Sequence, residues 1–147
     1  MIGDLSPQEI DDLLHSETVA RLGCHADGRT YVVPITYAYD GANVIGHSAE
    51  GRKVWMMRAN RHVCLEVERM YNPANWRSVI AWGEYQELKD GDAAAAIETL
   101  VARFRPMMTS VTASPGHTHA TPADVGRSKA VIYRIHLTEK SGRYERR

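Results

Sequence analysis

The sequence predicts a mainly β protein of the α+β class, built on a six-stranded antiparallel barrel with helices inserted between strands. Six short segments are rich in β-branched and aromatic residues, and several of them alternate between apolar and polar positions. Most of these segments are joined by short turn signals, which favour antiparallel hairpins. A closed barrel is favoured because closure removes exposed sheet edges, although the pattern alone also permits a sandwich.

The length and charge of the chain exclude several classes of protein. Its 147 residues fit one domain over residues 1–147. Eighteen basic residues balance eighteen acidic ones, so no basic field favours a nucleic-acid partner. No apolar run approaches the roughly 20 residues that span a bilayer, and the N-terminus lacks the features of a secretory signal. We therefore expect a cytoplasmic protein with neither a membrane nor a nucleic-acid partner.

The first third of the chain alternates turn signals with β-rich runs. Ser6–Glu9 forms a capping box with proline at the first helical position, which predicts a short helix over residues 7–15. Asp27-Gly28 and Asp40-Gly41 are pairs that favour tight hairpin turns. The strands predicted around these turns run over residues 19–24, 30–39 and 43–48.

The remaining strands and two further helices are predicted in the rest of the chain. Gly83 interrupts a long β-rich run and predicts a bulge. Residues 93–104 are alanine-rich with apolar residues at helical spacing, while residues 108–128 have the composition of a mobile loop. The other predictions are a helix at 52–61, strands at 62–68, 76–88 and 129–137, a connection at 70–75 and a polar tail at 138–147.

No metal centre is predicted. Cys24 and Cys64 lie 40 residues apart in separate predicted strands, without the spacing of a zinc site, and are interpreted as two reduced, buried thiols. His117 and His119 lie in the long loop and are interpreted as solvated residues, because no third ligand for a metal or haem is near them in the sequence.

The segment from Ile45 to Lys53 has the pattern of a phosphate site. It runs from a strand through a glycine turn to a helix start, where Arg52 and Lys53 follow Gly51. A helix N-terminus offers unpaired backbone N–H groups and partial positive charge, to which the two cations add. Ser48 is a further candidate donor. The alternative interpretation is a solvated basic helix start.

The runs VVPITYAYDGANVIGHSAEGRKVWMMRANRHVCLEVE and NWRSVIAWGEYQEL resemble the FMN-binding pattern of the pyridoxamine-5′-phosphate-oxidase-like superfamily of split β-barrels. The resemblance is nearest to the branch of nitroimidazole-resistance proteins. It covers residues 20–88, with weaker agreement at the final strand and at residues 141–143. It implies an FMN-binding split barrel that assembles as a homodimer, with two flavins between the subunits.

The resemblance also assigns roles to individual residues. His47 is the candidate catalytic residue, because an imidazole can donate and accept a proton during flavin chemistry; the alternative is a histidine that only bonds a neighbour. The cofactor-binding candidates are Pro34, Ile35, Thr36 and Tyr37 beside the polar edge of the isoalloxazine ring, His47, Ser48 and Ala49 along the ring and ribityl chain, Gly51, Arg52 and Lys53 at the 5′-phosphate, and Trp76, Ser78 and Val79 near the dimer interface.

The implied activity is that of an FMN-dependent oxidoreductase acting on a small molecule, such as a nitroaromatic or similar electron-poor compound. Gly51 stands where the full oxidases carry serine, and the chain ends in SGRYERR without their C-terminal substrate-binding segment. True pyridoxamine-phosphate oxidase activity is therefore not expected. The alternatives are a non-catalytic protein that binds flavin, deazaflavin or haem, and a barrel whose ligand site has decayed.

Overall fold

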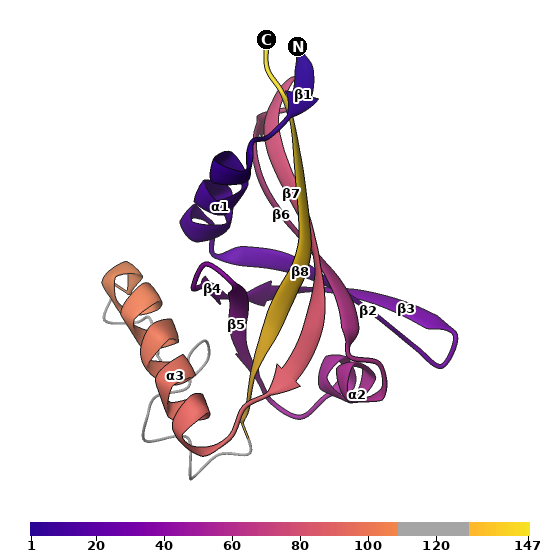
Figure 1. The fold of residues 1–147 in the computed structure, drawn as a ribbon, viewed down its shortest axis with the longest axis vertical. Coiled ribbons are helices and arrows are strands. Elements are labelled where there is room, and N and C mark those ends of the chain that lie inside the picture. Colours follow the sequence, from indigo (N-terminus) through magenta and orange to yellow (C-terminus); the bar gives the residue numbers. More distant parts are fainter. Residues whose placement is uncertain (109–129) are drawn as a thin grey trace.

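A computed structural model describes residues 1–108 and 130–147, which form one strongly curved antiparallel sheet flanked by helices (Figure 1). The strand order is β3-β2-β6-β7-β8-β5-β4, and β1 pairs with β8. The predicted loop at 108–128 lies outside the described residues beyond position 108. The strands are β1 (Ile2–Asp4), β2 (Val19–Ala26), β3 (Arg29–Thr36), β4 (Ala38–Tyr39), β5 (Asn43–Ser48), β6 (His62–Asn72), β7 (Asn75–Glu87) and β8 (Val131–Glu145); the helices are α1 (Pro7–Ser16), α2 (Arg52–Ala59), α3 (Asp90–Phe104) and the 3₁₀ turn η1 (Arg105–Met107).

The connection between β3 and β4 closes the sheet into a barrel. These strands lie at opposite ends of the strand order, yet only Tyr37 separates them in the chain. The sheet must therefore curl until its two ends meet. No described residue of β3 pairs with β5, so the barrel is split at this seam. The predicted fold class is confirmed, whereas the predicted count of six strands is wrong because the short β1 and β4 are strands of their own.

Tyr37 explains why the strand predicted over residues 30–39 breaks in two. Its side chain is fully buried, and its hydroxyl donates to the Leu14 carbonyl at 2.7 Å. Its backbone N–H donates to the carbonyl of Thr18 at 3.0 Å. These contacts anchor the chain where it leaves one end of the sheet and enters the other.

Two other predicted boundaries are wrong because ladder pairing extends the strands. The connection predicted over residues 70–75 is only the two-residue turn at 73–74, since Met70 pairs with Trp76 and Asn72 with Asn75. The polar tail at 138–147 instead continues β8 to Glu145 and pairs with β7 and β1. Backbone hydrogen bonds hold these polar segments, and such bonds leave no apolar pattern in the sequence. The bulge predicted at Gly83 is confirmed by a register shift between Trp82 and Gly83.

The core has two parts. The larger cluster fills the barrel beneath α1, and the smaller one packs α3 against Ile45 and Ile132 on the outside of β5 and β8. The predicted capping box of α1 is confirmed, with Ser6 Oγ accepting from the Glu9 amide at 3.2 Å.

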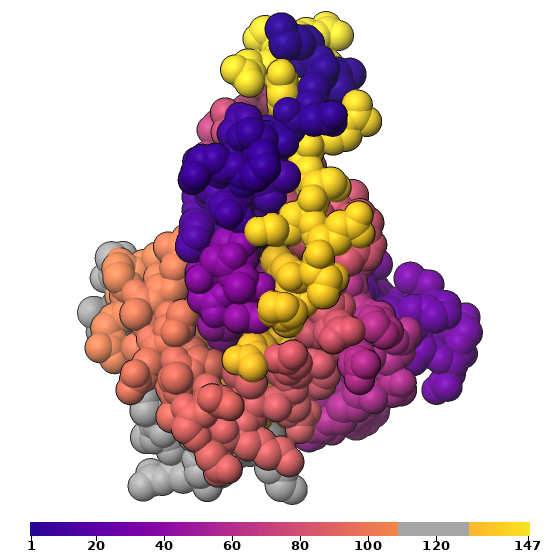
Figure 2. Space-filling view, in the orientation of Figure 1, coloured from indigo at the N-terminus to yellow at the C-terminus, as the bar shows by residue number. Residues whose placement is uncertain are grey.

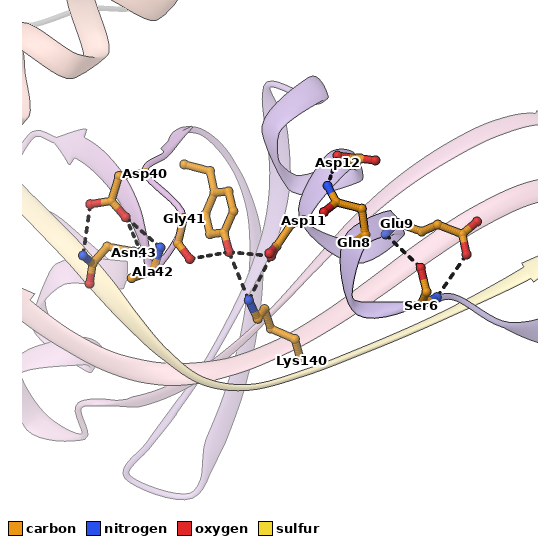
Figure 3. A network of polar contacts seen from close by, with 11 residues as sticks. Ser6, Gln8, Glu9, Asp11, Asp12, Asp40, Gly41, Ala42, Asn43 and Lys140 are labelled. Atoms are coloured by element: carbon orange, nitrogen blue, oxygen red, sulfur yellow. Dashed lines mark hydrogen bonds and ion pairs between the residues drawn. The ribbon is translucent and has the colours of Figure 1, made fainter.

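A polar network locks α1 to the barrel (Figure 3). Lys140 Nζ on β8 donates to Asp11 Oδ1 at 2.9 Å and to the Tyr39 hydroxyl at 3.1 Å. Tyr39 in turn donates to Asp11 Oδ1 at 2.8 Å. Three elements distant in sequence, α1, β4 and β8, therefore meet at one carboxylate.

Both cysteines are free thiols, and Cys24 is buried as predicted, whereas the predicted burial of Cys64 is wrong because this residue is only half-buried. Within the described ranges, no three His, Cys, Asp or Glu side chains are grouped so that they could hold a metal ion. The described helices are all too short or too polar to span a lipid bilayer.

Candidate functional site

The predicted strand–turn–helix unit places two cations in the first turn of a helix. β5 ends at Ser48, and α2 begins at Arg52 with Gly51 as its N-cap. Gly51 provides no side-chain cap, so the first N–H groups of α2 have no side-chain acceptor there. We call Gly51, Arg52 and Lys53 the cationic cradle.

The cradle carries positive charge that no acidic side chain among the described residues neutralises. Neither Arg52 nor Lys53 forms an ion pair with any carboxylate in the described part of the chain. The Arg52 guanidinium lies over the Tyr31 ring, 5.7 Å from its centroid. Lys53 is half-buried, and this burial lowers the pKa of its ammonium group. A bound anion would stabilise both cations.

The neighbouring acidic residue, Glu50, is held by another arginine. Arg58 donates two hydrogen bonds to the Glu50 carboxylate, both at 2.8 Å, and a third to Glu87 at 2.8 Å. These hydrogen bonds lower the pKa of Glu50. The negative charge of Glu50 is therefore already paired within the chain. Arg52 and Lys53 remain available to bind an anion.

At the split of the barrel, one edge of β3 carries backbone groups that no other described strand pairs with. The Tyr37 amide bonds toward β2, and the alternation of an antiparallel ladder places Ile35 on the same side. The backbone groups of Pro34 and Thr36 then point to the other side, where β3 has no paired strand in the described residues. Proline suits this position, because an edge strand needs no N–H there. Tyr37, by contrast, has both its amide and its hydroxyl bonded inside the chain.

The residues predicted along the ring and ribityl chain lie across the split from this edge. Ala38 pairs with Ile45, and continuing that register by two residues places Thr36 opposite His47. The half-buried His47 lies on the same face of β5 as Ile45, which packs toward α3. Ser48 donates its hydroxyl to the Ala49 carbonyl at 2.7 Å.

Trp76 and Ser78 lie toward the other end of the sheet from the cradle, and Val79, which pairs with Val67, lies nearer the middle of β6. β6 starts near α2 at His62, and Trp76 pairs with Met70, about 26 Å further along that strand. The Trp76 indole donates to Glu145 at 3.2 Å, and Ser78 donates to Glu66 at 2.8 Å. Val79 is fully buried in the barrel core. Within one chain, the structure does not bring these three residues to the cradle.

A groove that the sequence analysis missed lies beside the cradle. It measures about 440 Å³ and runs between α2 and the turn of the β2–β3 hairpin. This hairpin projects from the body of the molecule (Figures 1 and 2). The spacing of its α2 residues marks one helical face and could have indicated a shared surface. Nothing in the sequence brings the hairpin turn to that face. The residues that line this α2 groove are Ala26, Asp27, Arg29, Arg52, Trp55, Met56 and Ala59.

Comparison with known proteins identifies proteins that are similar to this chain in sequence or in fold. The chain is 37% identical over 84 residues to an uncharacterised protein of Rhizobium meliloti (strain 1021), an alignment covering 57% of this chain and 56% of that protein. A FAD-binding protein from Mesorhizobium loti is 28% identical, with 99% of each chain covered and a TM-score of 0.74. A candidate 5-nitroimidazole antibiotic resistance protein from Bacteroides thetaiotaomicron shares the fold, at 17% identity, 98% and 87% coverage and a TM-score of 0.71. The sequence profile described as pyridoxamine 5′-phosphate oxidase matches residues 6–144, and the chain therefore belongs to that family.

Proposed function

We propose that this protein is a flavoprotein that binds FMN at the split, with the 5′-phosphate in the cationic cradle. The observation that carries the proposal is the pair of cations, Arg52 and Lys53, at an uncapped helix start with no acidic partner among the described residues. This arrangement fits a phosphate dianion. The similar Mesorhizobium loti protein, which binds FAD, supports a flavin as the ligand.

The polar edge of the ring would lie along the free edge of β3. The Thr36 N–H and the Pro34 and Thr36 carbonyls supply a donor and acceptors there, and these groups suit the alternating acceptors and donors of a flavin. When bound, the flavin would supply the redox chemistry by passing electrons from a reduced nicotinamide to a small electron-poor substrate. His47, across the split, is the proposed proton donor and acceptor.

We also propose that two copies form a homodimer through the outer face of the sheet. The ladder registers align Val32, Gly23, Cys64 and Trp82 in one row across four strands. Val32 is 64% exposed and Trp82 is 39% exposed, so this row leaves apolar surface in contact with water. Trp82 stands at one end of this row, and exposed apolar surface that includes an aromatic side chain is typical of homodimer interfaces.

Flavin titration of the purified protein tests the proposed site. A charged contact contributes about 1.5–3 kcal/mol, so Arg52→Ala and Lys53→Ala should each weaken FMN binding about 10- to 100-fold. Arg61→Ala is the matched control, because Arg61 is exposed just beyond α2 and faces Glu84 at 3.9 Å. An affinity that is unchanged in both cradle variants would place the phosphate elsewhere. A Soret band in the purified protein would identify haem as the ligand instead.

A further inference from the structure

One carboxylate stands immediately before the cradle. Glu50 precedes Gly51, the N-cap of α2, so it is the acidic residue closest in sequence to the uncapped N–H groups of the helix start. A carboxylate is stabilised at a helix N-terminus and beside cations for the same reasons as a phosphate. Glu50 would therefore compete with any anion for the cradle if its side chain were not held elsewhere.

The structure holds this carboxylate against the side of α2. Arg58 donates from both terminal nitrogens of its guanidinium group, Nη1 to Glu50 Oε2 and Nη2 to Oε1, each at 2.8 Å. The Trp55 indole donates to Oε2 at 3.2 Å. Both oxygens of Glu50 are thus bonded to residues further along the helix. Within the described residues, no ion pair joins Glu50 to Arg52 or Lys53.

Arg58 is itself fixed from β7. Its Nε donates to Glu87 Oε1 at 2.8 Å, and the same oxygen accepts from the Tyr85 hydroxyl at 2.7 Å. Tyr85 is buried in the barrel core. The hydrogen bonds from Arg58 lower the pKa of both Glu50 and Glu87, so both carboxylates stay charged at neutral pH. One guanidinium therefore links a carboxylate anchored to the core with the carboxylate beside the cradle.

Removal of Arg58 would leave Glu50 charged and weakly held. Its remaining hydrogen bond would come from Trp55, whose side chain is 61% exposed. A single bond from a neutral donor is weaker than a bidentate bond from a guanidinium. The free helix start and the two cations of the cradle lie within three residues of Glu50 and would attract its carboxylate. There its charge would repel a phosphate dianion and occupy the groups that bind it.

We propose that Arg58 is a positioning residue that keeps Glu50 out of the cradle, so that the cradle stays open to a phosphate. This inference rests on the proposed function, because the cradle is the site assigned to the FMN phosphate. It predicts that loss of Arg58 turns Glu50 into an internal competitor. The competition concerns the phosphate alone, so it should distinguish FMN from riboflavin, which has the same ring and ribityl chain without the phosphate.

Parallel titrations with FMN and riboflavin, followed by flavin fluorescence, test the proposal on the full chain. Arg58→Ala should weaken FMN binding about tenfold and change riboflavin binding less than about twofold. Adding Glu50→Gln to Arg58→Ala should return the FMN affinity to within about twofold of the native value, because the amide carries no charge. Arg58→Lys, which keeps a cation, should retain most of the FMN affinity. Arg61→Ala, which removes an exposed arginine just beyond α2, should leave both affinities unchanged.

An Arg58→Ala variant that binds FMN as tightly as the native protein would overturn the proposal and leave the flavin site in place. A double variant that binds FMN as weakly as Arg58→Ala would also overturn it, because the loss would then not depend on the charge of Glu50. Both variants lack the contact with Glu87, so their comparison holds even if that contact stabilises the fold. If the native protein binds no FMN, the proposed function fails together with this inference, and the native titration alone shows it.

Discussion

Gly83→Ala tests whether the sheet is as tightly packed at its bulge as the structure requires. Gly83 is buried on β7 at the register shift, next to β8. A methyl group added there would collide with the backbone carbonyl oxygen of His136 and lie 2.8 Å from Cγ2 of Ile135. Ile135 is fully buried, so it has no open space into which it can move.

The expected loss of stability follows from these two contacts. The His136 carbonyl belongs to the β7–β8 ladder and cannot turn away without disturbing the pairing of His136 with Glu84. Overpacking a filled site costs about 2–3 kcal/mol, and alanine recovers about 0.5–1 kcal/mol over glycine inside a strand. The free energy of unfolding should therefore fall by about 1–2.5 kcal/mol, which corresponds to a decrease of about 2–10 °C in Tm.

Urea denaturation and thermal unfolding of Gly83→Ala and Gly91→Ala measure this effect against a matched control. Gly91 lies in the first turn of α3, and a methyl group there would meet no atom within 4 Å. Gly91→Ala should leave the protein unchanged or stabilise it by about 0.5–1 kcal/mol. Equal stabilities of Gly83→Ala and the native protein would show that the bulge is looser than the structure has it.

Two further predictions concern the α1 network and the dimer. The hydrogen bond from Lys140 lowers the pKa of Asp11, so its stabilising contribution is present above the unfolded pKa near 3.8 and is lost as the pH falls through the lower folded value. Asp11→Asn should lower the free energy of unfolding at pH 7 by about 1 kcal/mol or less, because the carboxylate is 39% exposed. This difference should vanish in strong acid. A difference that is independent of pH would contradict the role given to the Asp11–Lys140 contact. If the proposed dimer forms, Trp82→Glu should convert it to a monomer in size-exclusion chromatography with light scattering, whereas Trp82→Phe should not; a Trp82→Glu dimer would place the interface elsewhere.

The features of the fold that could be predicted from the sequence are those that local chemistry determines. Asp27-Gly28 forms its hairpin turn with both residues at positive φ, as such pairs favour, and β5 has the predicted limits. The break at Tyr37 depends on contacts with Thr18 and Leu14 that no local pattern encodes. The strand character of residues 138–145 likewise depends on pairing with β7, which lies more than 50 residues earlier.

The candidate site shows the same division between local and distant information. The position of Arg52 and Lys53 at a helix start could be predicted from the sequence because the turn and the helix start are contiguous with them, and their role at a phosphate stays a prediction. Arg29 could not, because it reaches the same groove only when β2 and β3 fold back over α2. The FMN and small-molecule assignments themselves came from the resemblance and remain predictions, as do the roles of the split residues.

The positions of Trp76 and Ser78 relate the proposed flavin site to the proposed dimer interface. Trp76 lies about 26 Å and Ser78 about 20 Å from the cradle end of β6, too far to contact a flavin held by Arg52 of the same chain. A two-fold axis makes the same surface meet itself, so the residues at one end of the outer face in one copy can meet the opposite end in the other. The exposed row from Val32 to Trp82 lies on that face. Each flavin would then need both subunits, and Trp82→Glu, although Trp82 does not line the groove, should weaken flavin binding in step with the loss of the dimer.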